Sequence, residues 1–404
     1  MIDWKNAARS WKEGVLFGLI ALIIGAAVGA IAAVFGRGLI AISRLRDANV
    51  MRLVPFLAPA GILIVWAYKN YGKESSRGMG LVFAVGHGDE DKIPLRLIPF
   101  VLLSTWLTHL CGGSAGREGV AVQIGATLSH WMARHFKPNA GRVFLIAGMA
   151  AGFAGLFRTP FAAILFAIEV LYAGKIDYRA LFPCFTASFA ASTVSSMMGL
   201  SKFTADIGAE FDLNALLFGK LLLLGLLFGL TGRLFAALLS YVKKEVATRI
   251  KNPYLRVAAV GVMLSVLLLL LHKGRYCGLG TNLIDYSFSG GEIFSYDWLL
   301  KLLLTILTLS AGYQGGEVTP LFSIGASLGI ELAVLIKVPP KLCAALGYAA
   351  VFGSATNTFF APIMIGAEVF GFENLPLFFI VCTVAHCFGT HNSIYSAQKV
   401  LSEN

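Results

Sequence analysis

The sequence predicts an all-α integral membrane protein built from two related halves, and three observations support this prediction. Hydrophobic residues make up 57% of the 404 residues and charged residues only 14%, which excludes a soluble domain of this size. Long apolar runs recur along the whole chain. Residues 148–170 also resemble residues 347–369 at a constant offset of 199 positions, a repeat that is typical of duplicated transporter folds.

The apolar runs predict the helices in chain order. Several runs reach the roughly 20 residues that a bilayer span needs, whereas others are short and interrupted by Gly or Pro. Short interrupted segments are typical of helices that end partway across a membrane, where they line an enclosed cavity. The runs lie at 14–35, 53–68, 95–111, 141–157, 160–173, 179–200, 214–242, 253–272, 298–311, 341–353 and 374–388.

The internal repeat places two acidic residues at equivalent positions. The two related stretches share 10 of 23 positions, and the same offset carries Glu118 onto Glu317. It also carries Gly116 onto Gly315, inside SAGREGVAVQIGATL and QGGEVTPLFSIGASL. In duplicated membrane folds the substrate site lies where the halves meet. We therefore expect Glu118 and Glu317 to lie near such a site.

Charged residues predict the orientation of the halves. The net charge of +11 is not a nucleic-acid signal, because the basic residues gather at membrane boundaries such as 243–256 and the N-terminus. Under the positive-inside bias both should be cytoplasmic, whereas the acidic segment 201–214 suits the outer side. We therefore expect an N-terminal half at 1–200, an outer linker at 201–214 and an inverted C-terminal half at 215–404. The basic segment 36–52 is interpreted as the continuation of a long tilted helix.

Cysteine usage indicates neither disulfides nor a metal site. Cys382 and Cys387 lack metal-ligand spacing, and the other cysteines lie singly in apolar surroundings. We expect all of them to be small buried hydrophobic residues, and we expect no metal and no cofactor. The six are Cys111, Cys184, Cys277, Cys343, Cys382 and Cys387.

Five glutamates inside apolar segments are the informative polar residues. An ionised carboxylate in the membrane costs about 2.5 kcal/mol or more, so each should be paired, protonated, near water or near an interface. We expect Glu169, Glu331 and Glu368 to cap helices or to pair near interfaces. Glu118 and Glu317 differ, because each directly follows a glycine-rich turn, CGGSAGRE or GYQGGE.

Glycine-rich turns that open helices present backbone N–H groups and the positive end of the helix dipole. Placed inside a membrane, such turns can hold an anion without a fixed cation. A carboxylate beside them competes with the anion for the same donors, and its protonation couples anion movement to proton movement. The alternative, glycines that only allow close helix packing, does not explain the paired acids.

Several segments together resemble the CLC family of chloride channels and anion/proton exchangers. GSAGREGVAVQIG (113–125) is similar to the GREGP segment of that family, and GGEVTPLF (315–322) falls where the family has GxxxP. RGMGLVF (77–83) falls at the serine-bearing GSGIP turn, and TPFAAILFAIEV (159–170) resembles the NAPLAGILFxIEE helix. HNSIYSA (391–397) falls where the family carries its anion-binding tyrosine.

Departures from the family pattern resemble its fluoride/proton antiporter branch, CLC-F. Met79 stands where chloride-handling members have a serine, Val120 replaces a proline, and Val170 replaces the internal proton glutamate. The C-terminal turn instead carries Glu317, followed by Thr319. Met79 as ordinary apolar packing is the alternative interpretation. Fluoride is small and strongly hydrated, so stripping its water requires strong donors such as a protonated carboxyl, hydroxyls and backbone N–H groups.

The resemblance implies a CLC-like fold of about 16–18 helical segments in two inverted-topology repeats, without the CBS domains that some relatives append. It implies a multi-pass protein of the bacterial inner membrane, a homodimer with one pore per subunit, that exports fluoride in exchange for protons. The alternative is a chloride/proton exchanger or chloride channel of the same fold. The implied transport residues are Glu118 and Glu317, and the implied anion-binding residues are Gly78, Met79, Gly80, Arg117, Gly119, Val318, Thr319 and Tyr395.

Two other classes of protein fit the sequence less well. An intramembrane enzyme would need a Ser/His or paired-Asp constellation, and His109, His130 and His386 lie near no matching nucleophile. A purely structural role would leave Glu118 and Glu317 unexplained. The sequence therefore favours a transporter over an enzyme.

Overall fold

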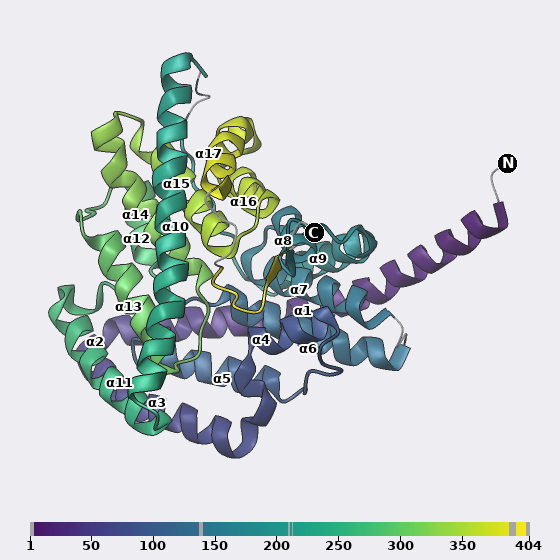
Figure 1. The fold of residues 1–404 in the computed structure, drawn as a ribbon, viewed down its shortest axis with the longest axis horizontal. Helices are drawn as coiled ribbons and strands as arrows, with labels where there is room; N and C mark the ends of the chain where they lie inside the picture. The colour runs from purple at the N-terminus through teal and green to yellow at the C-terminus, as the bar shows by residue number, and fades with distance from the viewer. Residues whose placement is uncertain (1–3, 137–139, 209–210, 212, 388–392, 401–404) are drawn as a thin grey trace.

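The protein is described from a computed structural model that covers residues 4–136, 140–208, 211, 213–387 and 393–400. These residues form seventeen α-helices joined by short turns, and the two strands have two residues each (Figure 1). The first nine helices are α1 (Trp4–Ala48), α2 (Val50–Leu53), α3 (Leu57–Ala67), α4 (Met79–His87), α5 (Leu97–Leu110), α6 (Glu118–Phe136), α7 (Gly141–Phe157), α8 (Pro160–Glu169) and α9 (Leu181–Met197). The others are α10 (Ala215–Arg249), α11 (Pro253–Leu270), α12 (Thr281–Ser289), α13 (Asp297–Ala311), α14 (Val318–Ile336), α15 (Pro340–Thr356), α16 (Phe360–Phe370) and α17 (Leu375–Cys387).

Six helical stretches in the described residues are long and apolar enough to cross a membrane, the longest being Lys12–Ala48, Val50–His87 and Ala215–Arg249. Figure 1 shows α1 and α10 as long helices that run roughly perpendicular to each other in this view. The predicted continuation of the helix through the basic segment 36–52 is confirmed as far as Ala48, where α1 ends, and the segment then enters the separate short helix α2. Shorter apolar helices such as α8 and α16 supply the interrupted segments that the sequence predicted.

Glycines allow two equivalent helix pairs to approach closely. Helices α6 and α7 meet at Gly125 and Gly148, and α14 and α15 meet at Gly325 and Gly347. A Cβ atom on any of these four glycines would collide with the backbone carbonyl of its partner glycine. Small residues at such crossings let backbones pack directly against each other in membranes.

Helices α8 and α16 cap each other through repeat-equivalent glutamates. The Glu169 carboxylate, at the end of α8, accepts from the backbone N–H groups of Phe359, Phe360 and Ala361 at 3.1, 3.1 and 2.8 Å. The Glu368 carboxylate accepts from the N–H groups of Phe161 and Ala162 at 3.3 and 2.8 Å. The predicted capping role of these two acids is therefore confirmed, and each satisfies donors that would otherwise lack partners at a helix start.

A short pair of strands holds the C-terminal segment in place. Strand β1 (Tyr172–Ala173) pairs in parallel with β2 (Lys399–Val400), which fixes the segment that carries Tyr395 against the end of α8. Three residues of the predicted linker at 201–214, Ala209, Glu210 and Asp212, lie outside the described residues, as do His391 and Asn392 of the tyrosine-bearing segment.

The cysteine prediction holds for all but one residue. Five cysteines are buried and free, whereas Cys387 is exposed at the end of α17. The prediction that all six are buried is therefore wrong for Cys387, because the last turn of a terminal helix has fewer neighbours to cover it.

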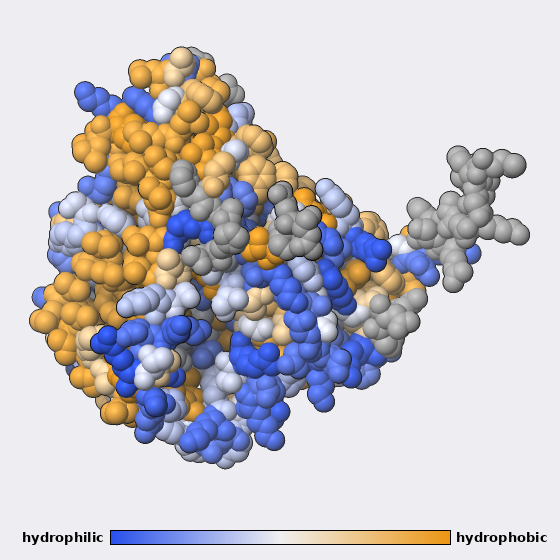
Figure 2. All heavy atoms as spheres, viewed as in Figure 1, coloured by the Kyte–Doolittle hydropathy of each residue, from blue (hydrophilic) through white to orange (hydrophobic). Residues whose placement is uncertain are grey.

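Hydrophobic residues cover the left of the face in Figure 2, and hydrophilic ones gather at its centre and lower edge.

Candidate functional site

The two glycine-rich turns meet directly. The N–H of Gly116 donates to the carbonyl of Gly316 at 2.5 Å, and the N–H of Gly316 donates to the carbonyl of Gly116 at 2.8 Å. A Cβ atom on Gly116 would lie 2.9 Å from the Gly316 carbonyl oxygen, so only glycine allows this antiparallel bridge. The bridge places the starts of α6 and α14 side by side.

Glu118 reaches from its own turn to the opposite helix. Its side chain is fully buried. Its Oε2 accepts from the Thr319 N–H at 3.1 Å, from the Thr319 hydroxyl at 2.5 Å and from the Arg117 N–H at 3.3 Å. Its Oε1 lies 3.5 Å from Arg117 Nε and makes no hydrogen bond within the described residues. The carboxylate thus occupies the donors at the start of α14 that could otherwise hold an anion.

Glu317 faces a cavity instead. Its side chain is partly exposed and lines a cavity of about 270 Å³. Its Oε2 lies 3.7 Å from where a Cβ atom on Gly119 would stand, so the carboxylate lies beside the start of α6. Lys243, near the C-terminal end of α10, lines the same cavity. The two equivalent acids therefore occupy different surroundings, one sealed and one open.

The turn before α4 and the C-terminal segment complete the cavity wall. Gly78 has a positive φ of 51°, a conformation that favours glycine, and precedes Met79 and Gly80 in the wall. The Tyr395 side chain is buried, its ring centroid lies 5.3 Å from that of Phe83, and its hydroxyl makes no hydrogen bond within the described chain. A buried hydroxyl without a partner is a donor available to a ligand.

The predicted site residues separate into two groups in the structure. The first lines the cavity and comprises Gly78, Met79, Gly80, Glu317 and Tyr395. The second surrounds the paired turns and comprises Arg117, Glu118, Gly119, Val318 and Thr319. The groups touch where Glu317 and Gly119 approach each other.

Sequence reasoning missed several polar residues near the site, among them Gln123, Lys243 and Lys301. Gln123 and Lys243 line the cavity, and Lys301 is completely buried on α13. Lys301 Nζ donates to Ser114 Oγ at 2.9 Å and to the carbonyls of Gly278 and Tyr276 at 2.7 and 3.2 Å. Ser114 lies four positions before Glu118, so the ammonium group supports the segment that leads to this acid. One lysine inside the apolar run 298–311 was the signal that could have found it.

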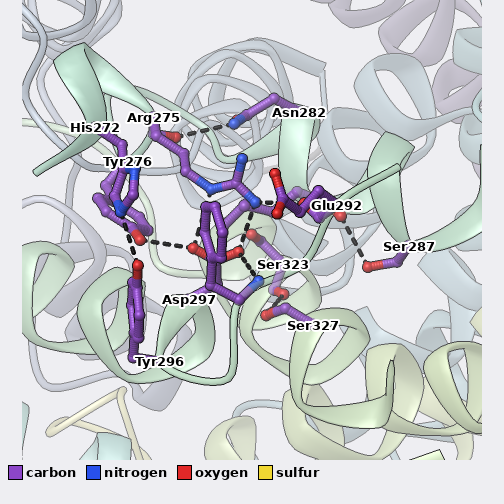
Figure 3. A network of polar contacts seen from close by, with 12 residues as sticks. His272, Arg275, Tyr276, Asn282, Ser287, Glu292, Tyr296, Asp297, Ser323 and Ser327 are labelled. Carbon is purple, nitrogen blue, oxygen red and sulfur yellow. Dashed lines mark hydrogen bonds and ion pairs between the residues drawn. The ribbon is translucent and has the colours of Figure 1, made fainter. Parts of the chain in front are cut away.

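A polar network centred on Asp297 holds the loop that Lys301 contacts (Figure 3). Arg275 binds the Asp297 carboxylate through two contacts of 3.0 and 2.6 Å, and the Tyr276 hydroxyl donates to it at 2.6 Å. The same loop pairs with the segment before Glu118, because the Gly278 N–H donates to the Gly113 carbonyl at 3.2 Å. The network therefore fixes the base of the first glycine-rich turn, and its charged groups have partners.

No group of three His, Cys, Asp or Glu side chains that could hold a metal ion occurs among the residues with a described position. The side chains described at the site supply carboxylates, hydroxyls, amides and the cationic groups of Arg117 and Lys243, beside the backbone donors.

The family model for the voltage gated chloride channel matches residues 60–390 of this chain. The chain belongs to this family. It is 37% identical over 395 residues to a protein from Pseudomonas syringae pv. tomato described as a chloride/fluoride channel protein, a match that covers 95% of this chain and 86% of the relative. The matched region contains both glycine-rich turns and α4, so this CLC chain carries these parts of its candidate site within the family core, and Tyr395 lies just beyond the matched residues.

Two solved structures share the fold. A structure described as a CLC-type fluoride/proton antiporter superimposes with a TM-score of 0.95 at 51% identity, covering 96% of this chain and 98% of the other. A cyanobacterial Cl⁻/H⁺ antiporter superimposes with a TM-score of 0.79 at 19% identity, covering 92% and 93%. The first likeness extends to sequence, whereas the second concerns the fold alone. The predicted CLC-like fold of a multi-pass, helical membrane protein is confirmed.

Proposed function

We propose that this CLC chain exports fluoride from the bacterial cytoplasm across the inner membrane in exchange for protons. The observation that carries the proposal is the Glu118 carboxylate, which crosses from α6 to the start of α14 and accepts two hydrogen bonds from Thr319. The 51% identity to a structure described as a fluoride/proton antiporter supports the choice of fluoride.

Glu118 acts as the proton-sensitive gate in this proposal. An ionised Glu118 competes with an anion for the N–H and hydroxyl donors of Thr319. Protonation removes the negative charge, weakens these hydrogen bonds and frees the donors for the anion. One side chain thereby links the arrival of a proton to the movement of an anion.

Glu317 handles protons or fluoride at the cavity. It lies in the open part of the site, beside Lys243 and close to Gly119. In its protonated form it is a hydrogen-bond donor, and fluoride is a strong acceptor. Since Val170 replaces the internal proton glutamate of exchangers, Glu317 is the acid that can pass protons between Glu118 and the cavity.

Fluoride binds mainly through neutral donors, and Arg117 adds a positive field. The proposed contacts are the backbone at Gly78, Gly80, Gly119 and Val318, the side chains of Thr319 and Tyr395, and the positive field of Arg117. Met79 contributes no hydroxyl donor, so the turn before α4 lacks the group that suits chloride. Neutral donors hold the ion without the strong binding that would slow its release.

The chain comprises two inverted halves at 1–200 and 215–404, and works as a homodimer with one pathway in each subunit. The two helix pairs α6–α7 and α14–α15, whose glycine crossings are equivalent, support the division into halves. The homodimer is supported by the family resemblance.

A flux assay in liposomes tests the function. We expect fluoride efflux to exceed chloride efflux and to change with an imposed pH gradient. Chloride efflux equal to fluoride efflux would favour the chloride exchanger, and fluoride efflux indifferent to pH would favour a channel, as the description of the Pseudomonas relative suggests.

A further inference from the structure

The carboxamide of Gln123 is a buried polar group that the proposed transport steps do not use. The side chain is 6% exposed, and its Oε1 is buried without a hydrogen-bond partner among the described residues. Buried amides almost always have partners within the protein or in bound water. A buried amide that lacks one, on the wall of a cavity, indicates that its partner is a ligand or solvent.

The position of Gln123 turns this amide toward the anion pathway. It lies on α6, five residues after Glu118, and lines the same cavity as Glu317 and Tyr395. A Cβ atom on Gly78 would lie 3.2 Å from its Oε1 and 3.7 Å from its Nε2. The amide therefore lies against the glycine that opens α4, and a side chain at position 78 would displace it.

The donor inventory of the cavity matches a small anion. An amide offers two N–H donors, and a tyrosine hydroxyl offers one. Both Gln123 and Tyr395 are more than nine-tenths buried, and neither the Gln123 Oε1 nor the Tyr395 hydroxyl has a partner in the described structure. The Gln123 Oε1 is itself an acceptor, but rotation of the amide exchanges it with Nε2 and turns N–H donors toward the same space. A dehydrated fluoride accepts hydrogen bonds and donates none, so it requires converging N–H and O–H groups. The amide is neutral, which favours release as well as binding.

We propose that Gln123 donates its amide N–H group to fluoride in the cavity beside Gly78 and is a binding residue of the transport pathway. The inference rests on the proposed fluoride/proton exchange and adds a ligand from α6 to the turn of α4 and the C-terminal segment. It assigns the Gln123 amide to substrate binding and leaves the proton steps to Glu118 and Glu317.

Gln123→Met tests this assignment, because methionine keeps the length of the side chain and removes its donors. The full chain is reconstituted in liposomes, and initial fluoride efflux is measured with an electrode over a range of internal fluoride concentrations. We expect the KM for fluoride to rise at least about tenfold, the loss of one hydrogen bond to a charged acceptor, while the maximal rate changes less than about threefold.

Gln314→Met is the matched control. Gln314 lines the same cavity, but its Nε2 already contacts the Gly312 carbonyl at 3.5 Å. We expect its KM for fluoride to stay at the wild-type value. A Gln123→Met protein that elutes as the wild type does and has a wild-type KM overturns the proposal, as does an equal rise in both variants.

Gln123→Asn covers the case in which Gln123→Met does not fold. Asparagine keeps the amide but withdraws it by one methylene, so a raised KM supports the proposal and an unchanged KM overturns it. Failure of the exchange function itself is a different result, since wild-type vesicles would then move no fluoride or no protons. Failure of this inference leaves wild-type exchange intact and the Gln123 variants identical to it.

Discussion

The turns that open α6 and α14 carry equivalent acids in different surroundings. Glu118 is fully buried and its Oε2 accepts three hydrogen bonds, two of them from Thr319 on the opposite helix. Glu317 is partly exposed and lines a cavity of about 270 Å³. Their glycines pair with each other through two backbone hydrogen bonds, so the turns themselves are close to symmetric.

The difference between these turns indicates how a duplicated motif can give proton transport a direction across the membrane. Two acids in identical surroundings would exchange protons with both sides of the membrane equally. In the proposed mechanism one acid competes for the anion's donors, whereas the other lines a cavity that Lys243 also lines, a residue of the basic segment expected at the cytoplasmic side. The sealed acid suits gating, and the open acid suits proton supply.

Replacing Glu118 should have the largest effect. Glu118→Gln keeps the shape of the side chain but cannot change its charge, so proton-coupled exchange should fall to background. The measurement is proton uptake by reconstituted vesicles under an anion gradient. Proton pumping by this variant at the wild-type rate would show that the sealed acid is not the gate. Glu169→Gln is the control, because this acid caps α16 outside the site.

Replacing Glu317 should stop coupled fluoride flux by a different route. Glu317→Ala removes both the proton carrier and a donor to the anion, whereas Glu317→Gln keeps a neutral donor. We therefore expect both to lose coupling and only Glu317→Gln to retain fluoride binding, measured as fluoride-dependent protection against thermal unfolding. Normal exchange by both variants would mean that the proton path runs elsewhere.

Thr319→Val should weaken the contact between the two turns without removing either acid. It deletes the hydroxyl that donates to Glu118 and preserves the shape of the side chain. The loss of one buried hydrogen bond to a carboxylate predicts coupled exchange slower by about tenfold. Thr319→Ser restores the donor and should recover most of the rate. Equal rates of coupled exchange with valine, serine or threonine at position 319 would mean that the hydroxyl takes no part in the mechanism.

Met79→Ser should produce the smallest change in rate and should act on selectivity. A hydroxyl at the start of α4 returns a donor that suits chloride, so the ratio of fluoride to chloride flux should fall several-fold. The two fluxes are measured with ion-specific electrodes on the same vesicles. An unchanged ratio would mean that Met79 is ordinary apolar packing.

Much of the fold could be predicted from the sequence, because membrane helices reveal themselves by length and hydropathy. The repeat located both glycine-rich turns, and the family resemblance placed Met79 and Tyr395 near them. The capping role of Glu169 and Glu368 followed from their positions at helix ends. The helices that they cap could not be predicted, because the partners lie about 190 to 207 positions away in the chain.

The missed residues lack a local signature. Gln123 lies in an apolar helix with no spacing pattern around it, and only the cavity reveals that its amide lacks a partner. Lys301 is supported by carbonyls of a loop more than twenty residues earlier in the chain. The different surroundings of Glu118 and Glu317 also could not be predicted from the sequence, since the repeat makes the two acids equivalent and only packing distinguishes them.

Proton movement driven by fluoride is the most direct test of the account. Wild-type vesicles are loaded with fluoride, diluted into fluoride-free buffer at equal pH, and followed with a pH-sensitive dye. Coupling through the two acids predicts that protons move into the vesicles as fluoride leaves, and that an uncoupler of the proton gradient abolishes the signal. Fluoride efflux without any proton movement under clamped voltage would contradict the account.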